Sequence, residues 1–253
     1  MDQVRDRIMN LLHYAGIQVR NGETRTIEDT IIKEGRFRLF INGALFSRLV
    51  ASDEMLRELG AGFVVNQGLA TSVGSVTVSG EDICVTATVH GDLEKEIATT
   101  GSVSVRRPLE KVSSSLRITK DEVFAITREI ETEVWRKTGG VHCSVLFHEG
   151  KVVIKSSDVG RHNTVDKVIG HAVLQGLDLS RCVIGCTGRQ PRDMVAKYAY
   201  AGIPIVISRA ASTDRGIATA AESGITLVCF SRGERFTVYT HAERIRDLFP
   251  EGE

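Results

Sequence analysis

Cysteine is scarce in this sequence, and long apolar runs are missing. The 253 residues contain five cysteines, an odd number too sparse for a disulfide scaffold, so we expect reduced and mostly buried thiols. No apolar run approaches the roughly 18 residues that a membrane-spanning helix needs. The chain begins with Met-Asp-Gln-Val-Arg-Asp-Arg, a charged stretch that is not typical of a secretory signal. These absences predict a cytoplasmic protein.

The sequence also has no excess of either charge. Its 32 basic side chains balance 32 acidic ones, whereas a broad nucleic-acid surface or a polybasic membrane surface needs a positive balance. We therefore expect no nucleic acid and no membrane as partner, although a local basic pocket is compatible with a neutral total. Apolar residues at 42% and charged residues at 25% are ordinary for globular proteins.

The first part of the chain has the alternating pattern of strands. An apolar residue occupies every second position over 37–41, and Asn42-Gly43, a favoured hairpin turn, follows. Residues 83–89 alternate in the same way and predict another half-buried strand. Ser52 is expected to cap a short helix.

Residues 106–120 differ in character from the sequence around them. An Arg-Arg-Pro sequence and a run of serines there are typical of a surface crossing. We expect a smaller β-rich domain over 1–118 and an α/β domain over 119–253. The alternative is an ordinary long loop within one domain.

Beyond this crossing, helical and strand patterns alternate. Thr119 is expected to cap the first helix and Gly139-Gly140 to end it. The segments that follow are strands at 142–147 and 151–156, a helix at 165–173, a strand at 182–185, a helix at 191–201, a strand at 204–207, a helix at 213–222, and strands at 225–230 and 236–240. This alternation predicts an α/β fold with a largely parallel sheet and right-handed crossovers.

Four of the predicted loops contain arginine. They span 158–163, 186–192, 208–215 and 230–235, and the first three lead into helices, of which Asn163 is expected to cap the first. Such loops meet at the carboxyl ends of parallel strands, where guanidinium groups and helix N-termini both favour phosphate. The pattern predicts a site for a phosphorylated or nucleotide-like ligand. A single such arginine is usually just solvated, so the prediction depends on convergence of the loops.

Some residues of the first loop allow two roles. His162 either contacts a ligand or satisfies a buried carbonyl group. Asp158 either belongs to the site or joins Asp166 in an internal network with Arg161 and Lys167.

No signature of a known metal site or activated nucleophile is present. The zinc-deaminase pair H-x-E and P-C-x-x-C, the G-x-S-x-G elbow and the Walker loop are all absent. Cys182 and Cys186 have a spacing that suits neither a redox pair nor a zinc site, and His142-Cys143 is more typical of core. We therefore expect no zinc and no other metal ligands.

Several motifs of the chain recur together in one known family. They are Thr-Gly-Gly-Val-His at 138–142, Asp-Val-Gly-Arg-His-Asn at 158–163 with Asp166-Lys167, Thr-Gly-Arg at 187–189, Ala-Gly-Ile-Pro at 201–204, Val-Tyr-Thr-His at 238–241 with Arg244, Ile-Asn-Gly at 41–43, and the stretch 62–68. In order and spacing they resemble the formate dehydrogenase accessory sulfurtransferase family (FdhD). The resemblance covers most of the chain.

The resemblance implies a function and a fold. Members of that family receive sulfur from a cysteine desulfurase as a persulfide. They pass it to the molybdenum or tungsten bis-molybdopterin guanine dinucleotide cofactor before the cofactor enters formate dehydrogenase. Their C-terminal half is a cytidine-deaminase-like three-layer α/β domain, and they form homodimers.

The resemblance and the arginine loops together assign the cofactor contacts. The segment that matches Phe230 to Arg235 contacts the cofactor in the family. The predicted cofactor-binding residues are Asp158, Gly160, Arg161, His162, Asn163, Thr187, Gly188, Arg189, Phe230, Ser231, Arg232, Gly233, Glu234 and Arg235.

One feature of the family is missing from this sequence. The family carries C-G-x-C just before a leucine that corresponds to Leu109, and this register places Gly101 and Ser104 at the two cysteine positions. A serine hydroxyl cannot form a persulfide and does not ionise near neutral pH. The sulfur-carrying residue therefore does not transfer to this chain, while the binding function does.

Three functions remain open at this point. The chain is a maturation factor that binds the cofactor and assists formate dehydrogenase, or a sulfurtransferase in which Cys143 or Cys186 replaces the missing thiol. Cys186 is the more attractive because Arg189 beside it is expected to lower its pKa, although a buried inert thiol is the simpler interpretation. The third possibility is a nucleotide-binding enzyme of other chemistry, with His162 and Asp158 as acid and base.

Overall fold

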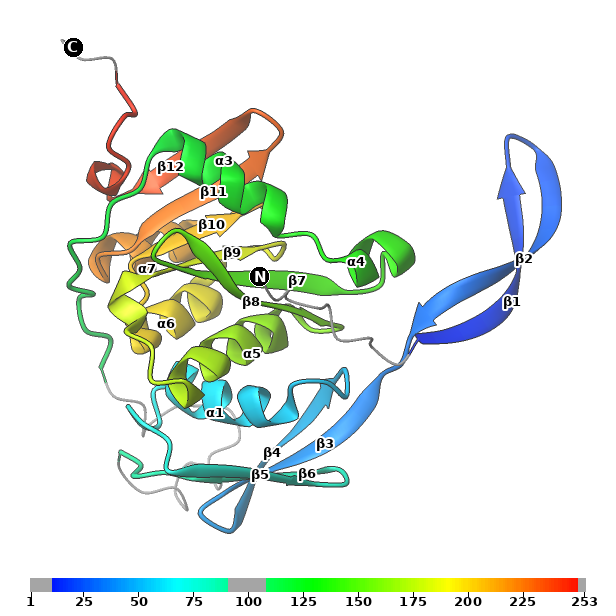
Figure 1. Cartoon of the computed structure of the whole chain (residues 1–253), viewed down its shortest axis with the longest axis horizontal. Helices are drawn as coiled ribbons and strands as arrows, with labels where there is room; N and C mark the ends of the chain where they lie inside the picture. The colour runs from blue at the N-terminus through cyan, green and yellow to red at the C-terminus, as the bar shows by residue number, and fades with distance from the viewer. Residues whose placement is uncertain (1–10, 91–107, 250–253) are drawn as a thin grey trace.

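The computed structural model describes residues 11–90 and 108–249, which form three β-sheets and the helices around them (Figure 1). The positions of Gly101 and Ser104 lie outside the described residues. A six-stranded sheet forms the centre of the molecule, a four-stranded sheet lies at one side of it, and a two-stranded arm projects away from both.

The six-stranded sheet has the strand order β12-β11-β10-β9-β7-β8. Its strands are β7 (His142–His148), β8 (Lys151–Asp158), β9 (Cys182–Cys186), β10 (Ile205–Ser208), β11 (Thr226–Arg232) and β12 (Arg235–Thr240). Strands β9, β10 and β11 are parallel, but β7 runs antiparallel to β8 and β9, and β12 runs antiparallel to β11. The prediction of a largely parallel sheet is therefore wrong on both sides of the centre, because tight turns at 149–150 and 233–234 make hairpins there.

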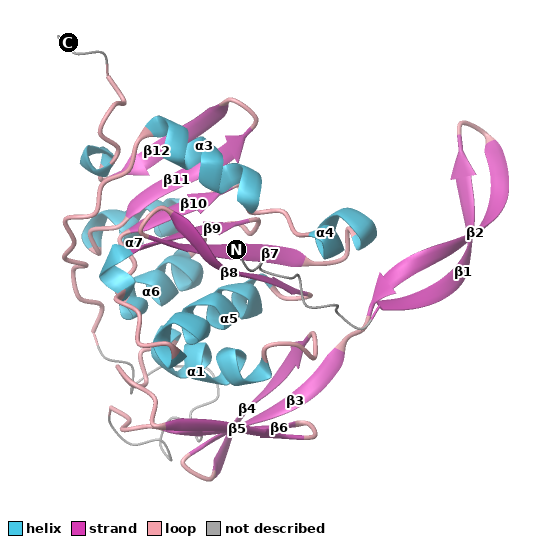
Figure 2. Cartoon of the chain, in the orientation of Figure 1, coloured by secondary structure: helices cyan, strands magenta, loops and turns pink. Residues whose placement is uncertain are grey.

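Helices cover both faces of this sheet (Figure 2). On one face lies α3 (Lys120–Glu129), and on the other lie α5 (Arg161–Leu174), α6 (Arg192–Ala201) and α7 (Asp214–Glu222). Residues of β9 alternate between the two cores: Ile184 packs toward α5 and α6, and Val183 packs toward α3. Because both faces are covered, all of β9 is buried, as its continuous apolar run predicts.

Capping at the start of the α/β part confirms the sequence prediction. Thr119 and Glu122 form a capping box at α3, and Gly139 ends the next helix in a left-handed conformation. The apolar spacing from Val123 to Val134 does not form one helix, however. The chain breaks at 130–132, and Thr132 caps a separate short helix, α4 (Glu133–Thr138).

The four-stranded sheet contains β3 (Gly35–Ile41), β4 (Ala44–Ala51), β5 (Ser75–Ser79) and β6 (Asp82–Thr86), in the order β4-β3-β6-β5. Helix α1 (Leu56–Asn66) covers one face of this sheet and packs with its other side on α5. A Cβ atom at Gly62 would lie 1.8 Å from the backbone oxygen of Asp166, and one at Gly170 would lie 1.8 Å from that of Glu58. The two helices thus cross backbone to backbone at these glycines.

The arm consists of β1 (Leu11–Arg20) and β2 (Glu23–Ile32), paired antiparallel through an Asn21-Gly22 turn. It extends away from the body, and Ile17 is 77% exposed on it. The sequence analysis did not predict this element, although Asn-Gly after alternating residues is the same hairpin signal that it used at residues 42–43.

Two local predictions are corrected by the structure. Ser52 does not cap α1, whose first residue is Leu56 and whose N-cap residue is Met55. Asn163 does not cap α5, because the N-cap residue is Gly160 and Asn163 lies inside the first turn. Both polar side chains are instead bonded to Asp158.

Candidate functional site

The four arginine loops lie at one edge of the six-stranded sheet. Strands β8, β9, β10 and β11 point in the same direction, because β7 is antiparallel to both of its neighbours and β9 to β11 are parallel. Their last residues are therefore at a common edge: Asp158, Cys186, Ser208 and Arg232. The predicted convergence of the loops is confirmed.

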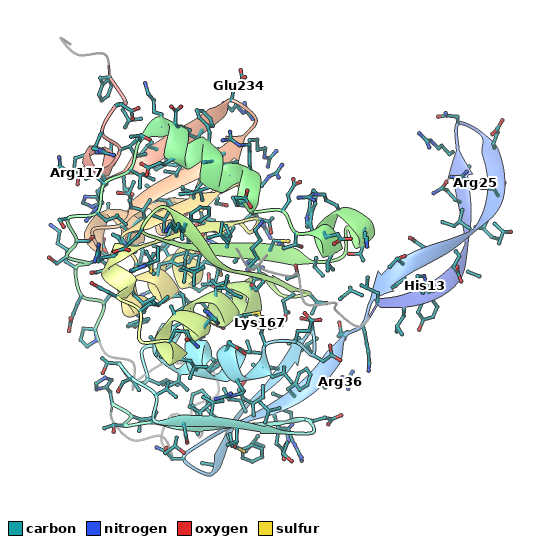
Figure 3. The ribbon with its side chains drawn as sticks, viewed as in Figure 1. His13, Arg25, Arg36, Arg117, Lys167 and Glu234 are labelled. Atoms are coloured by element: carbon teal, nitrogen blue, oxygen red, sulfur yellow. The ribbon has the colours of Figure 1, made fainter. Side chains whose placement is uncertain are left out.

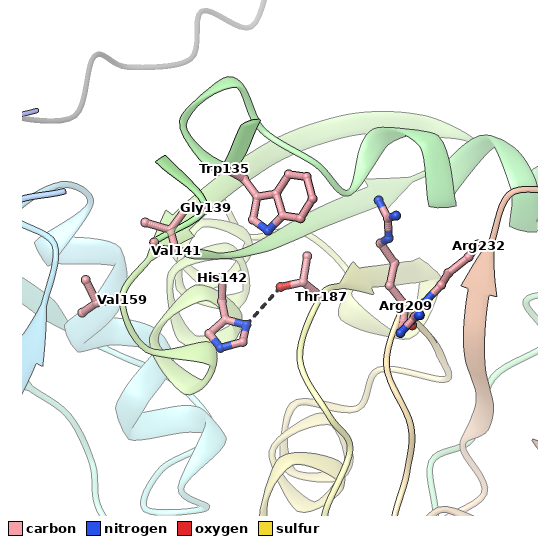
Figure 4. A pocket seen from close by; sticks show the side chains of 9 residues that line it. Trp135, Gly139, Val141, His142, Val159, Thr187, Arg209 and Arg232 are labelled. Carbon is pink, nitrogen blue, oxygen red and sulfur yellow. Dashed lines mark hydrogen bonds between the residues drawn. The ribbon is translucent and has the colours of Figure 1, made fainter. Parts of the chain in front are cut away.

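A cavity of about 540 Å³ opens at this edge (Figure 4). It is lined by residues of α4 and the turn after it, the start of β7 and all four loops: Trp135, Gly139, Gly140, Val141, His142, Val159, Thr187, Arg209 and Arg232. This volume is within the usual range of small-molecule sites, about 300–1,000 Å³.

Two arginines form the cationic wall of the cavity. The Nε atom of Arg232 donates to the backbone oxygen of Arg209 at 2.7 Å, so the guanidinium end of Arg232 lies at the base of the Arg209 side chain (Figure 4). Arg209 pairs with Glu131, and its guanidinium carbon lies 5.8 Å from the ring centroid of Trp135. Burial, reinforced by nearby Arg232, lowers the pKa of Arg209 from its ordinary value. In the part of the chain that the structure describes, no carboxylate pairs with Arg232.

His142 lies on the floor of the cavity between these arginines and the first loop. Its Nδ1 atom bonds to the Thr187 hydroxyl at 3.2 Å, which leaves Nε2 as the ring nitrogen that can meet a ligand (Figure 4). Burial lowers the pKa of His142, and the positive charge of Arg161 lowers it further. The neutral imidazole is therefore favoured in the free protein. The sequence analysis assigned this residue to the core, whereas the structure places it in the cavity.

Arg161 and Arg189 stand close to His142 without lining the cavity. The stem of Arg161 packs on Gly188, where a Cβ atom would lie 3.0 Å from the Arg161 Cβ. Among the described residues, the buried Nε atom of Arg161 finds no hydrogen-bond partner. Arg189 is exposed. These two guanidinium groups extend the positive edge of the cavity toward the N-terminus of α5.

Asp158 is occupied by other protein groups. Its Oδ2 atom accepts from Lys167 Nζ at 2.6 Å and from the Ser52 hydroxyl at 3.0 Å. Its Oδ1 atom accepts from Asn163 Nδ2 at 2.7 Å and from the Gly160 amide at 2.9 Å. The internal network that was the alternative is therefore present only in part: Asp158 pairs with Lys167, but Arg161 and Asp166 do not join it. Asp158, Gly160 and Asn163 shape the loop beside the cavity and are not in its lining.

Two further residues of α5, His162 and Asp166, make contacts outside the cavity lining. His162 Nε2 lies 2.7 Å from Asp193 Oδ2, so the pair joins the first turns of α5 and α6. Burial lowers the pKa of His162, against the opposing effect of the Asp193 bond. Asp166 is bonded to Lys197 at 2.8 Å and to Asn66 at 2.7 Å in a second buried cluster.

The segment from Phe230 to Arg235 contributes one side chain to the cavity, that of Arg232. Phe230 has a left-handed backbone (φ 53°) within an irregular part of β11, and this turns Ser231 inward, where its hydroxyl lies 2.5 Å from that of Thr127. Gly233 forms the hairpin turn, and Glu234 and Arg235 are exposed at the far end of it (Figure 3).

Neither candidate thiol has the surroundings of a nucleophile. Cys186 is 1% exposed, and burial raises its pKa although Tyr198 and Gln190 bond to the sulfur. The expected lowering of this pKa by Arg189 is wrong, because Arg189 points to solvent and the thiol lies under the sheet edge. Cys143 is fully buried and bonds to Thr132 at 3.2 Å.

Comparison with known proteins identifies the family. Residues 32–246 match the FdhD/NarQ family. The chain belongs to this family.

Two relatives and one solved structure match along most of their length. The sulfur carrier protein FdhD of Methanothermobacter thermautotrophicus is 34% identical over 234 residues, which cover 88% of this chain and 94% of the relative. The sulfur carrier protein FdhD of Wolinella succinogenes is 32% identical over 248 residues, covering 89% and 87%. The crystal structure of a candidate formate dehydrogenase accessory protein from Desulfotalea psychrophila superposes with a TM-score of 0.79 at 27% identity, covering 93% of this chain and 99% of that one.

Membership of the FdhD/NarQ family confirms the resemblance seen in the sequence, and the matching structure confirms a mixed α/β fold. The lining residues that were not predicted for the site are Trp135, Gly139, Gly140, Val141, His142, Val159 and Arg209. Arg209 belongs to the third arginine loop, so the sequence pattern already pointed to it, but the family resemblance favoured residues of the fourth loop.

Helices long and apolar enough to cross a membrane are not found in the described part of the chain.

Proposed function

We propose that this chain is an accessory protein of formate dehydrogenase that binds the molybdenum or tungsten bis-molybdopterin guanine dinucleotide cofactor of that enzyme at the sheet-edge cavity. The relatives supply the formate dehydrogenase and sulfur-carrier context. The observation that carries the proposal for this chain is the cavity itself, with Arg209, Arg232 and His142 facing one space of about 540 Å³.

The chemistry of these side chains suits a diphosphate. A guanidinium group offers paired donors to phosphate oxygens, and a charge-assisted bond is worth about 1.5–3 kcal/mol. The guanidinium of Arg232 lines the cavity and pairs with no carboxylate among the described residues, so its free N–H groups can donate to an anionic ligand. His142 can add a third positive group by taking up a proton when a phosphate arrives.

We further propose that sulfur does not pass through a thiol of this chain. Gly101 and Ser104 stand at the cysteine positions of the family, four of the five cysteines are buried, and the exposed Cys84 lies on β6 and does not line the cavity. The chain then holds the cofactor while a cysteine desulfurase or another carrier supplies sulfur. Incubation with a cysteine desulfurase and labelled cysteine, followed by intact-mass measurement, tests this: persulfide on any cysteine would contradict it.

The finer features of the family belong to the same proposal. We infer a cytidine-deaminase-like arrangement of residues 119–253, which the central sheet between α3 and the α5, α6 and α7 layer supports. The division at residue 118, a homodimer, a cytoplasmic location and contact with formate dehydrogenase complete the proposed assembly.

Calorimetric titration with GDP, a fragment of the cofactor, tests the binding proposal. We expect Arg232→Ala and Arg209→Ala each to weaken GDP binding about ten- to hundredfold, because each removes a charge-assisted bond. Arg235→Ala is the matched control, since Arg235 follows the same turn but does not line the cavity. Undiminished GDP binding by both cavity variants would contradict the proposal that GDP binds in the cavity.

One observation supports a second candidate function. The His162–Asp193 pair, 2.7 Å apart, is an oriented imidazole at two helix N-termini, which suits general acid–base catalysis on a bound nucleotide. Turnover of nucleotides that disappears in His162→Ala would favour this function, and absence of turnover by the wild-type chain would reject it.

A further inference from the structure

The cavity has an aromatic wall that phosphate binding does not require. Trp135 is half-buried: it packs on the core beneath α3 and borders the cavity beside the open backbone of Gly139 and Gly140 (Figure 4). A single phosphate group needs cationic or N–H donors and no ring. The position of this ring therefore calls for another ligand group.

The backbone holds Trp135 in place from both sides. Its amide donates to the Thr132 hydroxyl at 3.2 Å, and its carbonyl accepts from the Gly139 amide at 2.9 Å. The Thr132 hydroxyl lies 2.7 Å from that of Ser157 on β8, which ties the start of α4 to the sheet. A short helix fixed in this way presents its ring with little freedom, as a stacking surface requires.

The aromatic and cationic walls meet at Arg209. Its guanidinium carbon lies 5.8 Å from the centre of the Trp135 ring, and its backbone oxygen accepts from Arg232. A ligand that touches both walls must carry a flat apolar group and an anion a short distance apart. The volume of about 540 Å³ is far more than one phosphate occupies. A nucleotide has both parts and the required size.

We propose that Trp135 is the base-binding residue of the cavity and stacks on the purine base of a nucleotide whose phosphates meet Arg209 and Arg232. The inference rests on the proposed function and deepens it by dividing the cavity into a base subsite and a phosphate subsite. Stacking on one ring accepts any purine, so the base subsite selects a nucleotide over a bare diphosphate and does not choose between guanine and adenine.

The test uses the fact that the chain contains one tryptophan. Its fluorescence therefore reports on the cavity alone. We expect GDP to quench the fluorescence strongly on titration and pyrophosphate to bind with little quenching. By calorimetry, we expect Trp135→Leu to bind GDP about tenfold more weakly than the wild type and to bind pyrophosphate equally well. Trp135→Phe should retain most of the GDP affinity.

Each alternative result has a distinct meaning. GDP affinity unchanged in Trp135→Leu would overturn the base subsite and leave the proposed function intact. Equal loss of GDP and pyrophosphate binding in Trp135→Leu would show a structural role for the ring and also overturn it. A wild-type chain that binds neither ligand would overturn the proposed function together with this inference. Thermal melting of each variant separates lost binding from lost folding.

Discussion

Exposure separates Cys84 from the other four cysteines of the chain. Cys84 is exposed on β6, and Cys143, Cys182, Cys186 and Cys229 are buried. Burial raises the pKa of Cys182 and of Cys229 to about 12. Thiolates are the reactive form, so Cys182 and Cys229 are protected both by burial and by protonation.

Alkylation of the native protein should therefore modify Cys84 alone. We expect intact-mass analysis to show one added group under native conditions and five in denaturant. Cys84→Ser is the control and should show none in the native state. Rapid native modification of Cys186 or Cys143 would contradict the burial and reopen a sulfur-carrying role for that thiol.

The protonation of His142 should make ligand binding depend on pH. Burial and nearby Arg161 hold the pKa of the free side chain below its ordinary 6.5, and a bound phosphate favours the imidazolium and raises this pKa. Binding therefore takes up a proton, and pyrophosphate affinity should rise as the pH falls from about 8 to about 6, by at most about tenfold per pH unit. His142→Gln should lose this part of the rise, and an identical pH profile in both proteins would contradict the assignment.

For individual residues, the sequence could predict where cationic side chains gather but not which of them face the cavity. Arg232 and Thr187 were predicted and line the cavity, whereas Asp158 and Asn163 were predicted and bond to each other. The direction of a side chain in a loop depends on contacts from distant segments, here Ser52. Such contacts leave no local pattern.

Among the elements, the crossing of α1 and α5 depends on two glycines. Any larger residue at Gly62 or Gly170 brings a side-chain atom against the facing backbone at 1.8 Å. We expect Gly62→Ala and Gly170→Ala each to lower the free energy of unfolding by about 1–3 kcal/mol or more, because the helices must separate. Urea denaturation measures this loss.

Gly16→Ala on the arm is the matched control for this crossing. A Cβ atom there meets Ile27 at 3.8 Å, an ordinary contact, so stability should change little. If the Gly62 and Gly170 variants were as stable as Gly16→Ala, the close helix crossing would be wrong.

Element prediction succeeded where a pattern was complete within a few residues. The cap at Thr119 and the strands predicted at 182–185 and 204–207 are such cases. It failed at 130–132, because the apolar spacing continues through the break, where Thr132 caps the separate helix α4. That break creates α4 and so turns Trp135 toward the cavity.

For the whole molecule, a buried ion pair connects the four-stranded sheet with the six-stranded sheet. The Lys167 and Asp158 side chains are both 0% exposed, and Lys167 Nζ lies 2.6 Å from Asp158 Oδ2 (Lys167 is labelled in Figure 3). Both side chains also bond to Ser52, the residue after β4. Burial lowers the pKa of Lys167, and Asp158 opposes this effect. The pair fixes the loop beside the cavity relative to the N-terminal half.

Lys167→Met should therefore destabilise the whole chain, because it leaves the Asp158 carboxylate buried without its partner. We expect the free energy of unfolding to fall by about 3–5 kcal/mol. Lys137→Met, which removes an exposed pair with Glu133, should cost less than about 1 kcal/mol. Similar urea midpoints for the two variants would contradict the structural role of the buried pair.

The cavity at the sheet edge is proposed to receive the phosphates of a guanine-nucleotide cofactor. A crystal structure of the chain with GDP shows whether it does. We expect the diphosphate to lie between Arg209, Arg232 and His142, with the base against Trp135. A diphosphate bound elsewhere, for example beside Arg235 at the exposed β11–β12 turn, would contradict it.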